Sequence, residues 1–158
     1  MDEIEKTIGD ILRNNRMTLG LIESATGGLI SHRITNVAGS SEYYKGSITA
    51  YSNEIKNRIV GVKAETLEKH GSVSAQTAEE LASGGKKVLE VDICIADTGI
   101  AGPGGATPDK PVGLFYIGLS HANTTFNRKH IFNGDREQNK KEAAETALQI
   151  LKEYLESL

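Results

Sequence analysis

The sequence predicts an α/β fold, a three-layer α/β/α sandwich around a mixed, mostly parallel sheet with one antiparallel hairpin. Segments with helical spacing of apolar residues alternate with short apolar runs, as in domains whose helices cover both faces of a sheet. Two of these runs, at 17–22 and 93–96, lead into glycine-rich turns. Two later runs, at 112–120 and 124–132, are separated by only a few residues, which is typical of a hairpin.

The N-terminal third of the chain contains two helical patterns and two strand patterns. Apolar residues recur every three or four positions in the first helix, which Asn14-Asn15 end, and again after the first glycine turn. In the second strand, Ile48 alternates with polar neighbours. The expected elements are a helix at 2–15, a strand at 17–22, a helix to about residue 36 and a strand at 43–51.

Helical and strand patterns also alternate through the rest of the chain. Ser52 or Asn53 can cap a short helix, and Ser74 begins a longer one. Gly84-Gly85 lie inside that longer helix and cost it roughly 2 kcal/mol of helix propensity, so we expect a kink or close helix packing there. The remaining expected elements are a helix at 74–89, strands at 91–97, 112–120 and 124–132, and a final helix at 137–155.

Length and composition favour a single domain, residues 1–158, with a substantial hydrophobic core. The net charge is −3 and no basic block with interleaved aromatics is present, so nothing favours a nucleic-acid partner. The single cysteine, Cys94, lies in an apolar run, which excludes a disulfide framework and disfavours a Cys-His zinc site. No apolar segment approaches the roughly 20 residues that span a bilayer, and the N-terminus does not read as a signal peptide. We therefore expect a cytoplasmic protein with no membrane partner.

The most informative segment is Glu23–Gly28, where a strand passes into a helix. Such a turn directs backbone N–H groups and the Ser24 hydroxyl into one crevice at the positive end of a helix. Anion binding, an oxyanion hole and a serine nucleophile all fit this pattern, and so does a helix N-cap with glycines for a tight turn. We take Ser24 as a candidate nucleophile and Thr26, Gly27 and Gly28 as candidate substrate-binding residues.

A second glycine-rich loop, Thr98–Gly105, follows the apolar run at 93–96. Two glycine-rich loops at the ends of two strands indicate a ligand crevice at one edge of an α/β sheet. Neither loop is a Walker loop, and neither gives a clean Gly-x-Gly-x-x-Gly fingerprint that opens a helix. The candidate substrate-binding residues of this loop are Thr98, Gly99, Gly102 and Gly104.

A serine hydroxyl needs a nearby base to act as a nucleophile near neutral pH. The chain has four histidines, at positions 32, 70, 121 and 130. All four are expected to be surface or capping residues. Tyr51 ends a strand and Lys56 lies in the first turns of the next helix, so both can project into the crevice beside Ser24. A partly desolvated lysine can lose its proton near neutral pH and act as the base, with Tyr51 as a relay. Lys56 as an ordinary solvated lysine is the alternative.

Five motifs give the chain a resemblance to a known family. In order, they are ESATGG, GSSEYYKGSITAYSNEIK, TGIAGPGG, KPVG and FNGDR. The same motifs occur in this order in the CinA C-terminal domain family, and the resemblance covers roughly residues 5 to 155. Active members of that family are nicotinamide-nucleotide amidases, which convert nicotinamide mononucleotide to nicotinate mononucleotide and ammonia. The resemblance implies Ser24 as nucleophile, Tyr51 and Lys56 as its activating partners, and a nucleotide site lined by the second glycine loop and Arg136.

The chain departs from this family at one position of the first motif. The motif usually reads Ser-Cys-Thr-Gly-Gly, whereas this chain has Ala25 in place of the cysteine. If the thiol helps to shape the turn, the chain is a weak or inactive nucleotide-binding or regulatory module of the same fold, which is the alternative to an amidase. Many relatives also carry this domain behind a larger N-terminal domain with pyrophosphatase-type activity, and we expect the stand-alone form here.

The chemistry of amide hydrolysis fits these residues. The reaction needs a nucleophile, a proton shuttle for the leaving ammonia and donors for an oxyanion, and N–H groups near Thr26-Gly27 are candidates for the last. Arg136 is a candidate for a bidentate grip on the phosphate, although it can instead pair with Asp135 or Glu137. No metal or cofactor is expected, because no ligand cluster is visible. The expected partners are a small nucleotide substrate and a second copy of the chain, as a homodimer or higher homo-oligomer.

Overall fold

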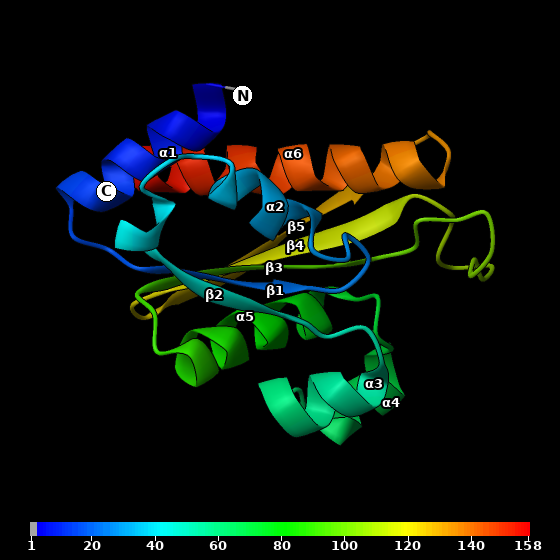
Figure 1. Cartoon of the computed structure of the whole chain (residues 1–158). Helices are drawn as coiled ribbons and strands as arrows, with labels where there is room; N and C mark the ends of the chain where they lie inside the picture. The colour runs from blue at the N-terminus through cyan, green and yellow to red at the C-terminus, as the bar shows by residue number, and fades with distance from the viewer. Residues whose placement is uncertain (1–2) are drawn as a thin grey trace.

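The computed structural model describes residues 3–158 and contains one mixed five-stranded sheet in the order β2-β1-β3-β4-β5 (Figure 1). The strands are β1 (Leu19–Glu23), β2 (Tyr44–Thr49), β3 (Ile93–Gly99), β4 (Leu114–His121) and β5 (Thr124–Ile131). Strand β1 runs parallel to both of its neighbours, β2 and β3. The β3–β4 and β4–β5 pairs are antiparallel, and the second of them is the predicted hairpin. The parallel part of the sheet therefore consists of β2, β1 and β3.

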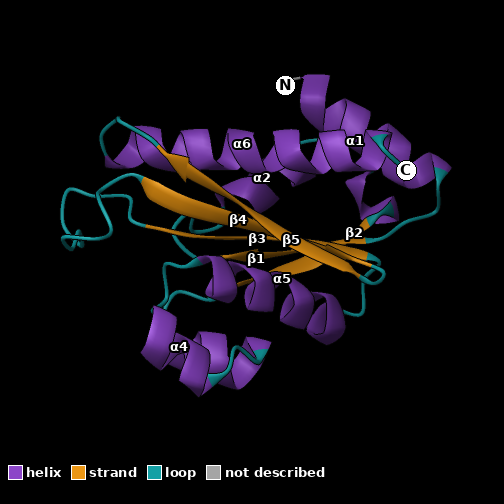
Figure 2. Ribbon diagram, turned by 180° about the vertical axis from the view of Figure 1, so that it is seen from behind, coloured by secondary structure: helices purple, strands orange, loops and turns teal. Residues whose placement is uncertain are grey.

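Helices cover both faces of the sheet, which confirms the three-layer architecture (Figures 1 and 2). One face carries α1 (Glu3–Asn14), α2 (Leu29–Thr35) and α6 (Arg136–Glu156). The other face carries α5 (Ala75–Leu89), with α3 (Asn53–Ile55), the π-helix η2 (Lys56–Val60) and α4 (Ala64–His70) beside it. A short 3-10 helix, η1 (Ser40–Glu42), precedes β2. None of the helices within residues 3–158 has the length and apolar character needed to cross a membrane.

The sequence patterns missed η1 and α4, and they placed several strand ends two residues away from the observed ones. The first turn of α4 is held by a residue that is distant in sequence. The carboxylate of Glu80 accepts hydrogen bonds from the Lys63 N–H at 2.9 Å and from the Thr66 hydroxyl at 2.6 Å. No local signal of the 64–70 segment reveals this partner on α5. The first residue of the predicted helix at 2–15 lies outside the described residues.

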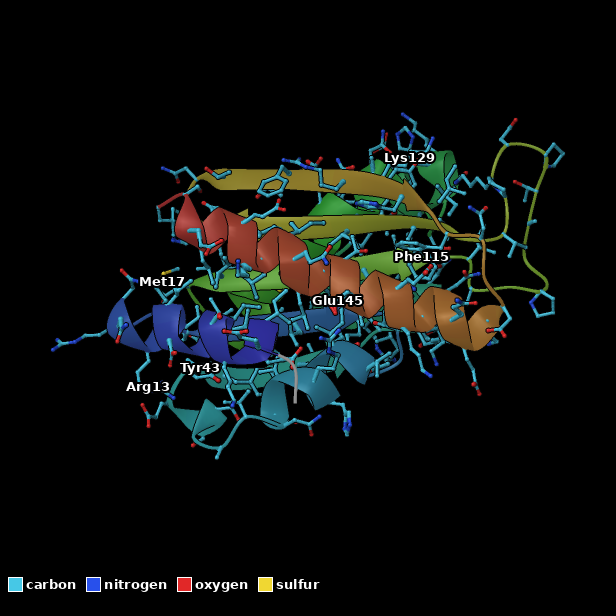
Figure 3. All side chains as sticks on the ribbon, turned by 90° about the horizontal axis from the view of Figure 1, so that it is seen from above. Arg13, Met17, Tyr43, Phe115, Lys129 and Glu145 are labelled. Carbon is cyan, nitrogen blue, oxygen red and sulfur yellow. The ribbon has the colours of Figure 1, made fainter. Side chains whose placement is uncertain are left out.

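The two faces of the sheet bury separate hydrophobic cores. Leu21 of β1 faces the core formed with α1, α2 and α6, whereas its neighbour Ile22 faces the core formed with α5. At the edge of the first core, the guanidinium carbon of Arg13 lies 5.6 Å from the centroid of the buried Tyr43 ring (Figure 3). Because β1 is buried on both faces, its sequence reads as a continuous apolar run that ends in Glu23.

The Gly84-Gly85 pair allows α5 to pack closely, which is one of the two predicted reasons for it. A Cβ atom at Gly85 would collide with Ile22 and would lie 2.8 Å from Cys94 Sγ, and one at Gly84 would collide with the Val60 carbonyl. The pair therefore brings α5 against the sheet on one side and against η2 on the other. Since η2 begins at Lys56, this contact also fixes the position of that lysine.

Gly85→Ala should lower the free energy of unfolding by about 1–3 kcal/mol, because the overpacking outweighs the roughly 1 kcal/mol of helix propensity gained. Urea denaturation monitored by circular dichroism measures this change in the free energy of unfolding. The matched control is Ser83→Ala in the same helix, expected within about 0.5 kcal/mol of the unmodified protein. A Gly85→Ala protein as stable as the unmodified one would contradict the close packing.

Candidate functional site

A cavity of about 410 Å³ lies at the carboxyl ends of the parallel strands β1 and β3. This is the place where an open α/β sheet forms its ligand crevice, because the chain passes from β1 to its neighbour β2 on one side and from β3 to its neighbour β4 on the other side. Eight of the residues predicted from the sequence line this cavity. They are Ser24, Tyr51, Lys56, Thr98, Gly99, Gly102, Gly104 and Arg136. The remaining lining residues are Ala25, Ser72, Val73, Ile100, Ala101 and Gly105.

Ser24 is the first residue after β1 and is almost fully buried. Its backbone N–H donates to Oδ1 of Asp97 on β3, at 3.0 Å. Its hydroxyl has no hydrogen-bond partner within residues 3–158 and faces the cavity. The turn thus holds the Ser24 backbone firmly and leaves its side-chain oxygen available to a ligand.

Lys56 is only 2% exposed, so the alternative of a solvated helix lysine is wrong. Its Nζ donates to the Tyr51 carbonyl oxygen at 2.9 Å, and this contact places the amine at the cavity wall. Burial lowers the pKa of Lys56 below its usual 10.5, while the Asp97 carboxyl acts in the opposite direction. A buried amine with a lowered pKa is suited to accept a proton.

Tyr51 and Arg136 form the rim of the cavity. The Tyr51 ring is 62% exposed, and its hydroxyl accepts a hydrogen bond from Arg136 Nη2 at 3.2 Å. Arg136 Nη1 donates to the Gly102 carbonyl oxygen at 2.7 Å. These two contacts, and not an ion pair with Asp135 or Glu137, fix the guanidinium in the described structure. Because a guanidinium has five N–H donors, several remain for an anionic ligand.

The second glycine loop is held from two sides. Thr98 Oγ1 donates to the Ser72 carbonyl at 2.6 Å, which joins the end of β3 to the segment that precedes α5. Asn139 of α6 is fully buried, and its Nδ2 donates to the Ala101 carbonyl at 3.0 Å. The Asn139 Oδ1 accepts from the Gly134 N–H at 2.9 Å. Asn139 therefore links the loop to α6, a role that no local pattern of residues indicates.

The predicted substrate-binding residues Thr26, Gly27 and Gly28 do not reach this cavity. They line a different hollow, beside α6. The prediction of an oxyanion hole at Thr26-Gly27 is also wrong, because both N–H groups already have acceptors. The Thr26 N–H donates to Asp97 Oδ2 at 3.2 Å, and the Gly27 N–H donates to the Ser24 carbonyl at 3.1 Å.

Glu23 explains why the start of α2 is not an anion site. Its buried carboxylate accepts hydrogen bonds from the N–H groups of Gly28, Ile30 and Ser31, at 2.9–3.1 Å, and from the Ser31 hydroxyl at 2.7 Å. The protein's own carboxylate thus takes the place that a ligand anion would occupy at the positive end of the helix. An acidic residue at the end of an apolar run, just before a glycine turn, was the signal for this capping role.

Asp97 is a further residue of the site that sequence analysis missed. It is fully buried on β3 and accepts from the backbone of both Ser24 and Thr26. Burial raises the pKa of Asp97 to about 6, partly offset by hydrogen bonds from Thr26 and Ser24. Its position inside the run Ile93–Gly99 was the available signal, because a carboxylate in a buried strand requires partners.

Ala25 occupies the position at which the family motif has a cysteine. It is 8% exposed and belongs to an apolar cluster with Ala101, Phe115 and Ala143. Phe115 projects from β4 toward this cluster, beside α6 (Figure 3). A side chain at position 25 therefore packs under the cavity, and the turn keeps its hydrogen bonds to Asp97 without a thiol.

None of the four histidines lines the cavity within the described chain. His121 Nδ1 is hydrogen bonded to the Tyr154 hydroxyl at 2.8 Å, and the His130 ring stacks on Phe132. His32 lines the hollow beside α6 and His70 is in the last turn of α4. The expectation that they are surface or capping residues agrees with these positions.

A known protein family matches almost the whole chain. The family model described as "CinA C-terminal domain" matches residues 1–155. The "CinA-like protein" of Thermotoga neapolitana is 44% identical over 98% of this chain, and the chain spans 38% of the length of that relative.

Solved structures resemble the whole chain. The competence damage-inducible protein A (ComA) of Klebsiella pneumoniae has a TM-score of 0.94 at 30% identity, covering 97% of this chain and 95% of that one. The competence/damage inducible protein CihA of Agrobacterium tumefaciens has a TM-score of 0.90 at 33% identity, covering 96% and 94%.

Asn139→Ala should lower the free energy of unfolding by about 2–3 kcal/mol, because it leaves the Ala101 carbonyl and the Gly134 N–H unpaired. Chemical denaturation measures this loss. Gln149→Ala, on the exposed side of the same helix, is the control and should change stability by less than about 0.5 kcal/mol. Equal effects of the two substitutions would show that Asn139 does not hold the loop.

Proposed function

The chain belongs to the CinA C-terminal domain family, and on that premise we propose that it is a nicotinamide-nucleotide amidase. The reaction is hydrolysis of the carboxamide of nicotinamide mononucleotide to nicotinate mononucleotide and ammonia. The observation that carries the proposal is the meeting of Ser24 and the buried Lys56 in one cavity. A nucleophile without a base, or a base exposed to water, would not support this chemistry.

The proposed mechanism begins with proton transfer from Ser24 to Lys56. Neutral Nζ takes the hydroxyl proton as Oγ bonds to the amide carbon, and the carbonyl oxygen becomes negative. Lys56 then gives the proton to the amide nitrogen, the C–N bond breaks and ammonia leaves. Water attacks the resulting ester on Ser24, with Lys56 again accepting and returning the proton. In the free protein the Ser24 hydroxyl is unpaired within residues 3–158, and such catalytic contacts often tighten only when substrate binds.

The Ala25 N–H is the donor proposed for the developing oxyanion. Within the turn from Ser24 to Gly28, it is the one described N–H without an acceptor. The N–H of the residue after a nucleophile serves this purpose in other hydrolases with a strand-to-helix turn. Substitution of its side chain leaves this N–H in place, which supports an active site despite Ala25.

The rim of the cavity, formed by Tyr51 and Arg136, is suited to a nucleotide substrate. Arg136 supplies donors for a phosphate, and the glycine loop from Gly99 to Gly105 allows the ligand to approach the backbone closely. Tyr51 presents an exposed ring beside them. Binding energy from the phosphate can then hold the carboxamide against Ser24, so that it contributes to turnover as well as to affinity.

Ser24→Ala should reduce turnover of nicotinamide mononucleotide by roughly 10³-fold or more while the protein stays folded. An enzyme-coupled ammonia assay measures the rate, and circular dichroism monitors the fold. If the variant retains more than about a tenth of the activity, Ser24 is only a structural residue of the turn. If the unmodified protein binds the nucleotide but releases no ammonia, the chain is a binding module.

Lys56→Arg should be nearly inactive, because a guanidinium stays protonated and cannot accept the Ser24 proton. In the unmodified protein the rate should rise with pH and level off once Lys56 is deprotonated, at a pH below 10.5 because burial lowers its pKa. Initial rates across a pH series measure this. Lys69→Arg, on the exposed surface of α4, is the control and should leave the profile unchanged. An active Lys56→Arg protein would exclude this mechanism.

Arg136→Ala should lower kcat/KM for nicotinamide mononucleotide by roughly 10- to 100-fold and barely change it for nicotinamide riboside, which lacks the phosphate. Steady-state kinetics with both substrates measures the difference. Because Arg136 also holds Gly102 and Tyr51, an equal loss on both substrates would indicate a structural role. Comparable kcat/KM values for the two substrates in the unmodified protein would show that there is no phosphate site.

A further inference from the structure

The Thr26 hydroxyl lies between two fully buried carboxyl groups. Its Oγ1 is 2.6 Å from Glu23 Oε1 and 2.5 Å from Asp97 Oδ1, and both acidic residues are 0% exposed. A hydroxyl has one hydrogen and can donate it to only one of these oxygens. The other short contact has a hydrogen between its two oxygens only if one of the two carboxyl groups is protonated.

The surroundings of the two groups decide which one carries that hydrogen. Glu23 accepts three backbone N–H groups and the Ser31 hydroxyl, and such a set stabilises a carboxylate. Asp97 accepts only two backbone N–H groups, one on each oxygen. The Thr26 hydrogen therefore goes to Glu23, and the additional hydrogen is on Asp97 Oδ1, which still accepts the Ser24 N–H through a lone pair.

We propose that Asp97 is a positioning residue that holds one proton beneath the site, in the chain Asp97 Oδ1–H to Thr26 Oγ1–H to Glu23 Oε1. In this neutral form, Asp97 orders the turn that carries Ser24 without placing a negative charge near Lys56. The proton itself follows from the three side chains, whereas its benefit to Lys56 rests on the proposed function.

The charged neighbours of Asp97 support this arrangement. Burial raises the pKa of Asp97 to about 6, and Glu23 from β1 acts in the same direction. The hydrogen bond from Thr26 to Asp97 lowers this pKa, so a Thr26 hydrogen that goes to Glu23 removes a contribution that opposes burial. On the side of η2, burial lowers the pKa of Lys56 and an ionised Asp97 acts in the opposite direction. A neutral Asp97 leaves the effect of burial unopposed, so that Lys56 is a better base.

The protonation state can be measured without any assay of activity. The whole chain, labelled with 13C at its side-chain carboxyl groups, is titrated by NMR, and the Asp97 carboxyl is assigned through bonds from its Cβ. We expect the Asp97 resonance to keep the chemical shift of a protonated acid up to the pH at which Lys56 loses its proton, far above the ordinary value of about 3.9. An Asp97 resonance that ionises below that pH would overturn the proposal.

Two substitutions test the positioning role. Thr26→Ser keeps the hydroxyl and should keep both the Asp97 proton and most of the amidase activity. Thr26→Val removes the link between the carboxyl groups and should shift the Asp97 titration and reduce kcat more than KM changes. If Thr26→Val titrates and turns over like Thr26→Ser, the hydroxyl does not carry the proton and the proposal fails.

Asp97→Asn tests the effect on Lys56. The amide is neutral, like the proposed acid, so the pH at which the rate rises should move by less than about half a unit, although kcat falls about tenfold because one acceptor is lost. If Asp97 is ionised in the unmodified protein, removing its charge should move that pH down by one unit or more. If the unmodified protein shows no amidase activity, the proposed function fails, and the NMR titration still decides the protonation of Asp97.

Discussion

The hydrogen bonds that the Asp97 carboxyl accepts from the turn after β1 are the interaction on which the site depends. The pairing of β1 with β3 ends at Ile22 and Ala96, and beyond this point the two strands separate. The Asp97 side chain spans the opening and holds the backbone of Ser24 and Thr26. The crevice thus has a fixed floor, although the two strands that form it are no longer hydrogen bonded to each other.

Most of the fold could be predicted because its signals are local. Apolar periodicity distinguished helices from strands, and the short connection between β4 and β5 identified the hairpin. Helix α4 was missed because its first turn depends on Glu80, sixteen residues beyond its start at Ala64. Strand ends shifted for a similar reason, since the Asp92 carboxylate accepts the Thr18 N–H and shapes the entry to β1 and β3 together.

The candidate catalytic residues could be predicted from the sequence, whereas the place of the glycines after Thr26 could not, and the physical reasons differ. Ser24, Tyr51 and Lys56 follow the ends of adjacent parallel strands, and that topology alone brings them to one edge of the sheet. The glycines after Thr26 were assigned wrongly because a helix start offers free N–H groups only when no internal acid binds them. Here the Glu23 carboxylate accepts these N–H groups. Whether it can reach them depends on how far the turn folds back over the strand, and no pattern of residue types specifies this.

Helix α6 links the two ends of the molecule. It has 21 residues and so extends about 30 Å, with Arg136 at its first position over the cavity and a long contact with α1 farther along. A rod of this length magnifies small rotations: a tilt of about 2° about the α1 end displaces the other end by about 1 Å. A misplacement of that size is enough to change a reaction rate strongly. The packing of α1 against α6, remote from any reacting atom, is therefore part of what aligns the guanidinium.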